Sequence, residues 1–205
     1  MCNTYTLRRD FVKTRWKGGK WNPGKLQFSQ LEHGETWIIR PTRPAPVFLQ
    51  DETCRLMRWG FVRPWAKAIN NARLEKAHSP MWQEAFEKRR CLIPMSGWYE
   101  FTGPTGNMAA HLLDGAGDEL LLAAGLWEQS PEWGECYTML MTESEGVMKE
   151  IHTRMPIILS LEDGEQFLAG SAGSRVQPSG IAVRSKIVPS PLKKSRSGYV
   201  QEDLF

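Results

Sequence analysis

Residues 91–141 read CLIPMSGWYEFTGPTGNMAAHLLDGAGDELLLAAGLWEQSPEWGECYTMLM. Short apolar segments alternate here with segments rich in Gly, Pro, Ser and Asp, a pattern typical of strands joined by turns. The strand candidates are Cys91–Pro94, Trp98–Phe101, Ala109–Leu113, Leu120–Trp127 and Cys136–Met141. No helices separate them in the βαβ rhythm of a parallel sheet, so the stretch predicts a mainly antiparallel sheet.

The flanking sequence predicts more strands and two helices. Further strand candidates are Val47–Gln50, Cys54–Trp59 and Ile181–Val188. Ser79-Pro80 resembles an N-cap followed by proline at the first helical position, which predicts a helix that runs to about Arg89. Ser160–Asp163 resembles a capping box and predicts a second helix, which Gly170 would end.

The segment Arg40–Pro46 contains three prolines. Because proline has no N–H to donate to a sheet ladder, we predict an extended, rigid loop here rather than a helix or a central strand. From about Ser171 onward the chain is rich in Ser, Gly, Pro and Lys. We expect an α+β fold with a mainly antiparallel, barrel-like β core and a few flanking helices over residues 1–190. A flexible basic linker and C-terminal tail would occupy residues 191–205.

Composition is that of an ordinary globular protein: 205 residues, 41% hydrophobic and 24% charged. No apolar run approaches the roughly 20 residues of a membrane span, and no signal peptide is evident, so we expect a cytoplasmic protein. Lys and Arg outnumber Asp and Glu by nine to three in residues 1–43 and by six to two in residues 172–205, whereas residues 44–171 hold eleven against eighteen. Two basic ends around an acidic middle favour a polyanionic partner such as nucleic acid.

The four cysteines lie dozens of residues apart, with no Cys-x-x-Cys pair and no histidine at metal-ligand spacing. We therefore expect no metal site. Cys54, Cys91 and Cys136 have apolar, strand-like neighbours, which predicts buried, reduced core residues.

Cys2 differs from the other cysteines because it directly follows the initiator methionine. Removal of Met1 would leave an α-amine and a thiol on adjacent carbons. The pKa of such an amine is roughly 7.7–8.0 and that of a thiol about 8.5, so both nucleophiles are partly available near neutral pH. An aldehyde can form a Schiff base with the amine and then be trapped by sulfur as a thiazolidine. Taken alone, the position of Cys2 favours an incidental residue, and the rest of the chain must decide.

Four further segments carry polar or ionisable residues among strand-like or turn-like neighbours. With the amino terminus they form five blocks: Met1-Cys2, Arg58-Trp59-Gly60, Asn71-Ala72-Arg73, Gly97–Phe101 and Ile151–Pro156. Each block alone fits a plain structural role. Together, in this order and spacing, they resemble the SRAP family (SOS-response-associated peptidase domain), whose members shield abasic sites in single-stranded DNA. The resemblance covers roughly residues 1–190.

The resemblance implies that Cys2 forms a stable thiazolidine crosslink with the ring-opened sugar of an abasic site. It implies that Asn71 holds the Cys2 terminus and the sugar, because a flexible terminus must be positioned to react. Glu100 would be a general acid/base for ring opening and for proton transfers at the amine. His152 would protonate the departing sugar oxygen.

The resemblance also implies a binding surface for single-stranded DNA. Arg73 and Arg154 would contact phosphates beside the lesion, and Trp65 would stack on an adjacent base. No cofactor is implied, and we expect a nucleoid-associated monomer. The chain departs from the family pattern at Asn3-Thr4, Ile39–Pro44 and Val188–Ser190. These departures bear on the family's wedge-loop contacts and its preference for a duplex junction rather than on the crosslinking centre.

Two other function classes fit parts of the pattern. Cys2, Glu100 and His152 also suit a cysteine-type peptidase that removes the residue before Cys2. A non-covalent single-strand-binding module would suit the basic ends and the tryptophans, but it assigns no role to Glu100 and His152.

The last five residues, Gln201–Phe205, resemble the bacterial sliding-clamp-binding motif. The match lies at Gln201, Asp203, Leu204 and Phe205, with a departure at Glu202. Two apolar residues at the end of a linker suit a short linear anchor that fills a pocket on a clamp. A segment that packs back on the domain fits the same residues equally well.

Overall fold

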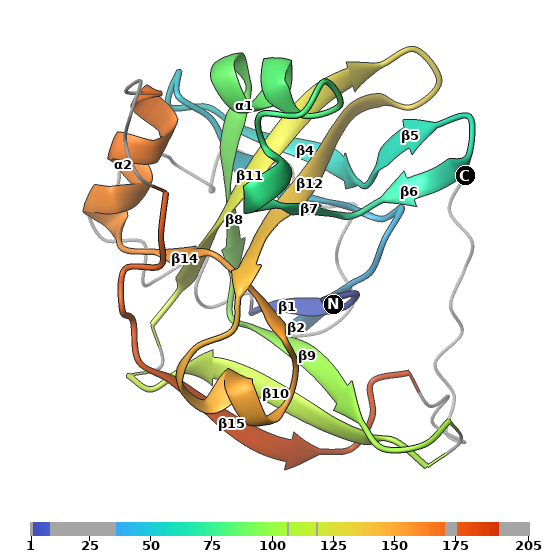
Figure 1. Ribbon diagram of the computed structural model, residues 1–205, viewed down its shortest axis with the longest axis vertical. Helices are drawn as coiled ribbons and strands as arrows, with labels where there is room; N and C mark the ends of the chain where they lie inside the picture. Colours follow the sequence, from blue (N-terminus) through green and yellow to red (C-terminus); the bar gives the residue numbers. More distant parts are fainter. Residues whose placement is uncertain (1, 9–35, 106, 118, 171–175, 193–205) are drawn as a thin grey trace.

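The computed structural model describes residues 2–8, 36–105, 107–117, 119–170 and 176–192. These residues form a mainly antiparallel β structure with two α-helices (Figure 1). The strands are β1 (Tyr5–Arg8), β2 (Thr36–Ile39), β3 (Pro44–Phe48), β4 (Cys54–Trp59), β5 (Phe61–Arg63), β6 (Ala66–Ile69), β7 (Asn71–Arg73), β8 (Arg90–Met95), β9 (Gly97–Thr102), β10 (Ala109–Gly115), β11 (Leu121–Ser130), β12 (Gly134–Glu143), β13 (Arg154–Pro156), β14 (Ile158–Leu159) and β15 (Val183–Val188). The helices are α1 (Gln83–Lys88) and α2 (Leu161–Ala169), with 3₁₀ turns η4 (Leu74–Lys76) and η5 (Gly146–Glu150).

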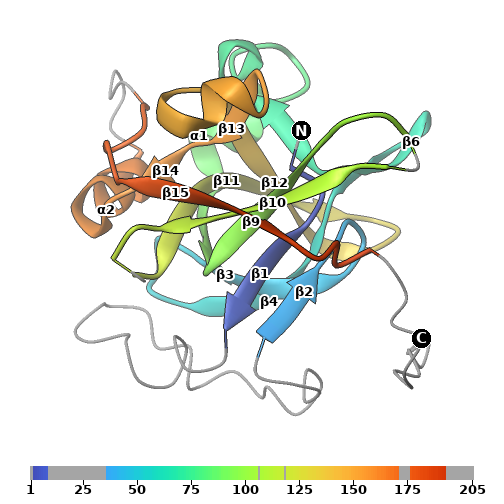
Figure 2. The same cartoon turned by 90° about the horizontal axis from the view of Figure 1, so that it is seen from below.

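Five strands close into a barrel-like core. β12 pairs with both β4 and β11, and the circuit is completed by the pairings of β4 with β3, β3 with β8, and β8 with β11. A second sheet, in the order β15-β10-β9-β1-β2, lies below this core (Figures 1 and 2). The expected α+β fold with an antiparallel, barrel-like core is confirmed.

Alternation along the strands divides the apolar residues into two clusters, because successive side chains of a strand point to opposite faces. In β8, Cys91 and Ile93 belong to the cluster that also contains Cys2 and Tyr5. Leu92, between them, belongs to the cluster formed with residues of α1 and α2. The barrel interior therefore supports the amino terminus, while the helices cover the outside. None of the helices within the described ranges is long and apolar enough to cross a membrane.

Two local predictions need correction. The Ser79-Pro80 helix begins later, at Gln83, because the carbonyl of Ser79 first accepts from the backbone N–H groups of Trp82 and Gln83 in a turn. The proline-rich segment is partly a strand: β3 starts at Pro44 and lies between β4 and β8. β8 pairs with β3 only at Phe48, so the prolines have a ladder partner on one side alone and their missing donors cost little.

The helix predicted from Ser160–Asp163 is confirmed, although the backbone N–H of Ser160 donates to Ser179 and not to Asp163. Ser160 accepts a hydrogen bond from the backbone N–H of Asp163 at the start of α2, and Gly170 ends the helix with a left-handed φ of 68°. Cys91 and Cys136 are buried as expected, whereas Cys54 is only partly buried.

Arg90 should contribute strongly to stability, because it joins the ends of both helices. Its guanidinium donates to the carbonyls of Phe86 (2.6 Å) and Phe167 (3.0 Å) and lies 4.4 Å and 5.1 Å from the centres of their rings. Helix-terminal carbonyls need such partners. We expect Arg90→Met to lower the free energy of unfolding by about 2 kcal/mol in a urea titration. Lys88→Met, at an exposed position nearby, is the control, and an equal loss in both variants would contradict this role.

Candidate active site around Cys2

Cys2 lies three residues before β1 and is fully buried (0% exposed). Its carbonyl oxygen accepts hydrogen bonds from the side-chain amides of Asn71 (2.8 Å) and Asn70 (3.1 Å). The Asn70 amide also donates to the side-chain oxygen of Asn3 (2.8 Å). Two adjacent asparagines therefore hold the beginning of the chain. Asn70 was not predicted, although the doubled asparagine in the sequence was a signal that could have identified it.

The asparagine pair is held by Trp59 of the Arg-Trp-Gly block. The indole N–H of Trp59 donates to the carbonyl of Asn70 (2.9 Å), which also accepts from the backbone N–H of Met139 (3.0 Å). Trp59 stacks on Tyr137 and meets Tyr5 edge-on, with ring centres 6.3 Å and 5.0 Å apart. The hydroxyls of the two tyrosines share a hydrogen bond of 2.5 Å. This buried aromatic group is a rigid support beneath the amino terminus.

The Cys2 thiol is predominantly protonated. Burial raises its pKa far above the ordinary value, and the charge of Glu100 raises it further. The thiol donates to the carbonyl of Thr4 (3.7 Å). This contact and the positive charge of the chain's first amino group, which belongs to Met1 in this structure, oppose the rise in pKa without overcoming it. A resting thiolate is therefore not the reactive form in this arrangement.

Glu100 lies on β9 with its side chain almost fully buried. Burial raises the pKa of this carboxyl to about 7, against the opposing charge of the amino terminus and a hydrogen bond with it. Near neutral pH, Glu100 can both accept and donate a proton. The side-chain oxygen of Asn71 is also buried, and it has no hydrogen-bond partner among the described residues.

His152 follows η5 and is half-buried. Its Nδ1 lies 2.9 Å from the backbone N–H of Arg154 and 3.2 Å from the carbonyl oxygen of Arg154; the shorter contact favours a neutral ring that carries its proton on Nε2. Burial lowers the pKa of His152, and the positive charge of the amino terminus lowers it further. His152 is therefore mostly neutral at neutral pH.

The fold brings four of the predicted site residues to the amino terminus. Asn71 contacts Cys2 directly. The charge of Glu100 acts on the Cys2 thiol, and the charge of the Met1 amino group, which precedes Cys2 in this structure, acts on both Glu100 and His152. These residues come from segments that are far apart in the sequence.

The predicted phosphate contacts differ in their surroundings. The Arg154 guanidinium forms a bidentate ion pair with Glu75, at 3.0 Å and 2.5 Å. Arg73 is exposed. Slight burial raises the pKa of Glu75, but hydrogen bonds from its own backbone and from Arg154, and the charges of Arg154 and Arg73, outweigh this and leave the pKa lowered. Glu75 was not predicted, and it lies between the two cations.

Trp65 is 74% exposed in the turn between β5 and β6, a position compatible with base stacking. The predicted clamp-binding residues Gln201, Asp203, Leu204 and Phe205 lie outside the described residues.

A family model described as SOS response associated peptidase (SRAP) matches residues 1–188. The chain belongs to this family.

The chain is also similar in sequence to named proteins and similar in fold to a solved structure. The abasic site processing protein YoqW of Bacillus subtilis is 31% identical over 186 residues, which cover 82% of this chain and 80% of YoqW. An abasic site processing protein of Saccharomyces cerevisiae is 30% identical over 136 residues, which are 60% of this chain but only 37% of the yeast protein. A crystal structure of a Bacteroides thetaiotaomicron protein has the same fold, with a TM-score of 0.76, 19% identity and 95% of each chain covered.

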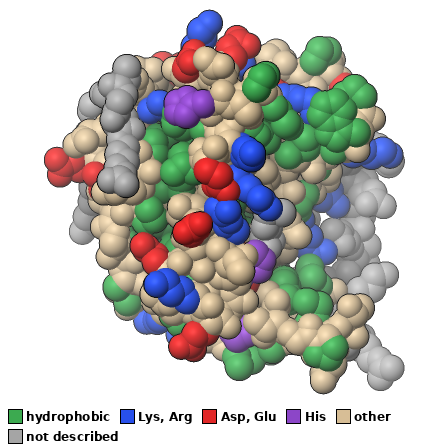
Figure 3. Space-filling model, viewed as in Figure 1, with side chains coloured by type: hydrophobic (Ala, Val, Ile, Leu, Met, Phe, Trp, Pro, Cys, Tyr) green, Lys and Arg blue, Asp and Glu red, His purple; other side chains and the backbone are tan. Residues whose placement is uncertain are grey.

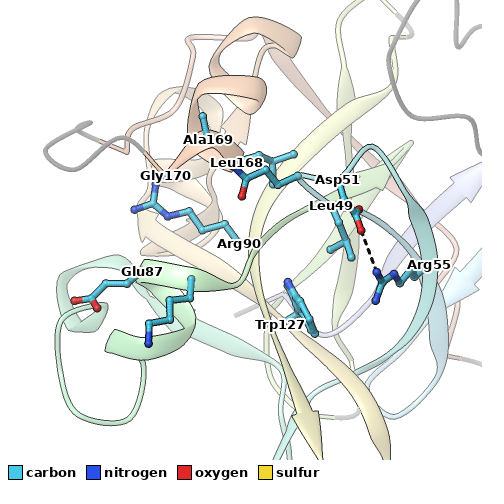
Figure 4. Close-up of a pocket in the computed structure, with 11 residues that line it drawn as sticks. Leu49, Asp51, Arg55, Glu87, Arg90, Trp127, Leu168, Ala169 and Gly170 are labelled. Carbon is cyan, nitrogen blue, oxygen red and sulfur yellow. Dashed lines mark hydrogen bonds and ion pairs between the residues drawn. The ribbon is translucent and has the colours of Figure 1, made fainter.

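A cavity of about 640 Å³ in this SRAP protein lies away from Cys2, between the β3–β4 turn and the C-terminal ends of the two helices (Figure 4). Arg55, Arg90 and Trp127 are among its lining residues. Arg55 is paired with Asp51 and Glu135, and Arg90 is bonded to the helix-terminal carbonyls. These two arginines thus have structural partners, and none of the predicted site residues lines the cavity.

Proposed function

We propose that this SRAP chain recognises abasic sites in single-stranded DNA and, after removal of Met1, joins them covalently through Cys2, which shields the lesion. The observation that carries the proposal is the pair of amide hydrogen bonds from Asn70 and Asn71 to the carbonyl of Cys2. Two amide donors on one carbonyl fix the position of Cys2, as a reactive residue requires and an incidental one does not. The related proteins from B. subtilis and yeast are named abasic site processing proteins, which supports an abasic site as the target of this chain.

The chemistry starts with the amine. The α-amine of Cys2 attacks the aldehyde carbon of the open sugar, and loss of one water gives an imine. The thiol then adds to the same carbon, and its proton passes to the imine nitrogen, which closes the thiazolidine. The raised pKa of the thiol suits this order, because the sulfur is needed only in the second step. The same raised pKa disfavours a peptidase that depends on a resting thiolate.

The surrounding residues suit these proton transfers. Glu100, with a pKa of about 7, can take a proton from the terminal ammonium and return one to the departing hydroxyl. The side-chain oxygen of Asn71, which has no partner among the described residues, can accept an N–H of the amine and fix its direction. His152 can donate from Nε2 to the sugar oxygen as the ring opens.

The decisive experiment uses the mature protein and a single-stranded oligonucleotide with one abasic site. We expect an adduct that survives boiling in detergent, with a mass equal to protein plus DNA minus one water. The control oligonucleotide carries a tetrahydrofuran abasic analogue, which has no aldehyde. Absence of an adduct with the true abasic site, or an equal adduct with the analogue, would contradict the proposal.

Arg73 and Arg154 are proposed to contact DNA phosphates, and Glu75 to hold Arg154 in place beforehand. We expect Arg73→Ala and Arg154→Ala to weaken binding to single-stranded DNA. Each should make the plot of log affinity against log salt shallower by about 0.7 for every phosphate that the variant no longer neutralises. Lys149→Ala, at an exposed position on η5, is the control. Unchanged salt dependence in both arginine variants would remove them from the interface.

A further inference from the structure

Two exposed tryptophans lie on two neighbouring hairpins. Trp65 is in the β5–β6 turn, and Trp133, 49% exposed, is in the β11–β12 turn. They are the two aromatic residues among the exposed large apolar side chains of the described ranges. β5 contacts both β11 and β12, and the two hairpins project together at the upper right of Figure 1. Apolar side chains gather on this part of the face in Figure 3.

Arg58 fastens the two hairpins to each other. Its guanidinium lies 4.4 Å from the centre of the Trp133 ring. The same group donates to the carbonyl of Gly60 (3.0 Å) and to that of Lys67 on β6 (3.1 Å), and Arg58 is itself buried. One face of the Trp133 ring is therefore covered by a fixed cation, while about half of the side chain stays open to solvent. These contacts give a structural role to Arg58, the first residue of the Arg-Trp-Gly block, which has no role in the proposed reaction.

This surface is continuous with the Cys2 site. β6 (Ala66–Ile69) connects Trp65 to Asn70, which holds the carbonyl of Cys2, and five residues of extended chain span roughly 16 Å. Trp133 is four residues from Tyr137, which lies beneath the amino terminus, a span of roughly 13 Å. Lys67 is exposed on β6 between Trp65 and Asn70. A strand that leaves the lesion along β6 would meet a cation and then the two aromatic rings.

We propose that Trp133 is a second base-stacking platform, which extends the single-stranded DNA surface beyond Trp65. The inference rests on the proposed function for the direction of the strand, but not on the covalent chemistry. Aromatic platforms beside basic groups bind single strands with little sequence preference, because every base has a π-face. The Arg58 guanidinium behind the ring keeps it from collapsing onto the core.

The test measures affinity for undamaged single strands of increasing length, from about 4 to about 16 nucleotides. Fluorescence anisotropy would compare the wild type with Trp133→Ala and Trp133→Phe. We expect Trp133→Ala to bind the longest strand about fivefold or more weakly, with little change for the shortest. Trp133→Phe should retain most of the affinity. Glu132→Gln, on the same turn, should bind long strands more tightly, because an exposed carboxylate near the DNA is removed.

Two results would overturn the proposal. One is unchanged affinity of Trp133→Ala at every length. The other is an equal loss at every length, which would indicate damage to the fold; a thermal melt of each variant checks this directly. Undamaged DNA separates the test from the covalent reaction. If the length-dependent loss is seen while abasic DNA gives no adduct, the platform stands and the proposed chemistry fails.

Discussion

Cys2→Ala should abolish the stable adduct with abasic single-stranded DNA. The variant keeps an α-amine and can still form an imine, but it has no sulfur to close the ring, and an imine hydrolyses when the protein is denatured. A protein with extra residues ahead of Cys2 should fail as well, because it keeps the thiol but places the amine elsewhere. The measurement is a denaturing gel with labelled DNA, supported by the intact mass of the adduct.

Borohydride gives a sharper form of this experiment, since it reduces an imine to a permanent amine bond. We expect Cys2→Ala to be trapped on abasic DNA only when borohydride is present, whereas the wild type needs none. Cys54→Ala, which changes a partly buried cysteine outside the site, should crosslink like the wild type. A stable adduct of Cys2→Ala without reductant would disprove the thiazolidine.

The second large effect is expected at Glu100 and His152. Positioned general acids and bases contribute typically ~10²–10⁴-fold in rate, so Glu100→Gln and His152→Ala should slow adduct formation by factors in this range. Glutamine preserves the shape of the buried side chain but cannot transfer the proton. Binding to the tetrahydrofuran analogue, which reports affinity without chemistry, should change far less. Losses confined to binding would instead indicate a non-covalent module.

The pH dependence provides a separate test of Glu100. Its pKa is raised to about 7 by burial, so the carboxylate that accepts the ammonium proton is present mainly above that pH. The crosslinking rate of the wild type should therefore rise as the pH passes through about 7. Glu100→Gln should lose this rise and keep only the later titration of the amine itself. An identical profile in the two proteins would exclude Glu100 as the base.

Local patterns predicted most of the strands, since alternating apolar residues between turn residues specify them without reference to the rest of the chain. β4 spans Cys54–Trp59 as predicted, and α2 begins at the expected residue. The error at the proline-rich segment arose because strand pairing in the tertiary structure decides the outcome there. Pro44 and Pro46 are compatible with β3 only because β8 leaves that part of the strand unpaired, and no local pattern reveals which side of a strand has a neighbour.

The sequence by itself also identified the family, because five blocks in order are specific even where each block is ordinary. It identified Cys2 as the unusual nucleophile, since an aminothiol exists only at a chain end. Only the tertiary structure decided how that end is held. Four contacts join residues from separate strands and turns: those of Asn70 with Cys2, Trp59 with Asn70, Glu75 with Arg154 and Arg58 with Trp133. These contacts depend on which strands become neighbours, and so does the burial that raises the pKa of Glu100. In a closed barrel, the pairing of distant strands is a property of the whole chain.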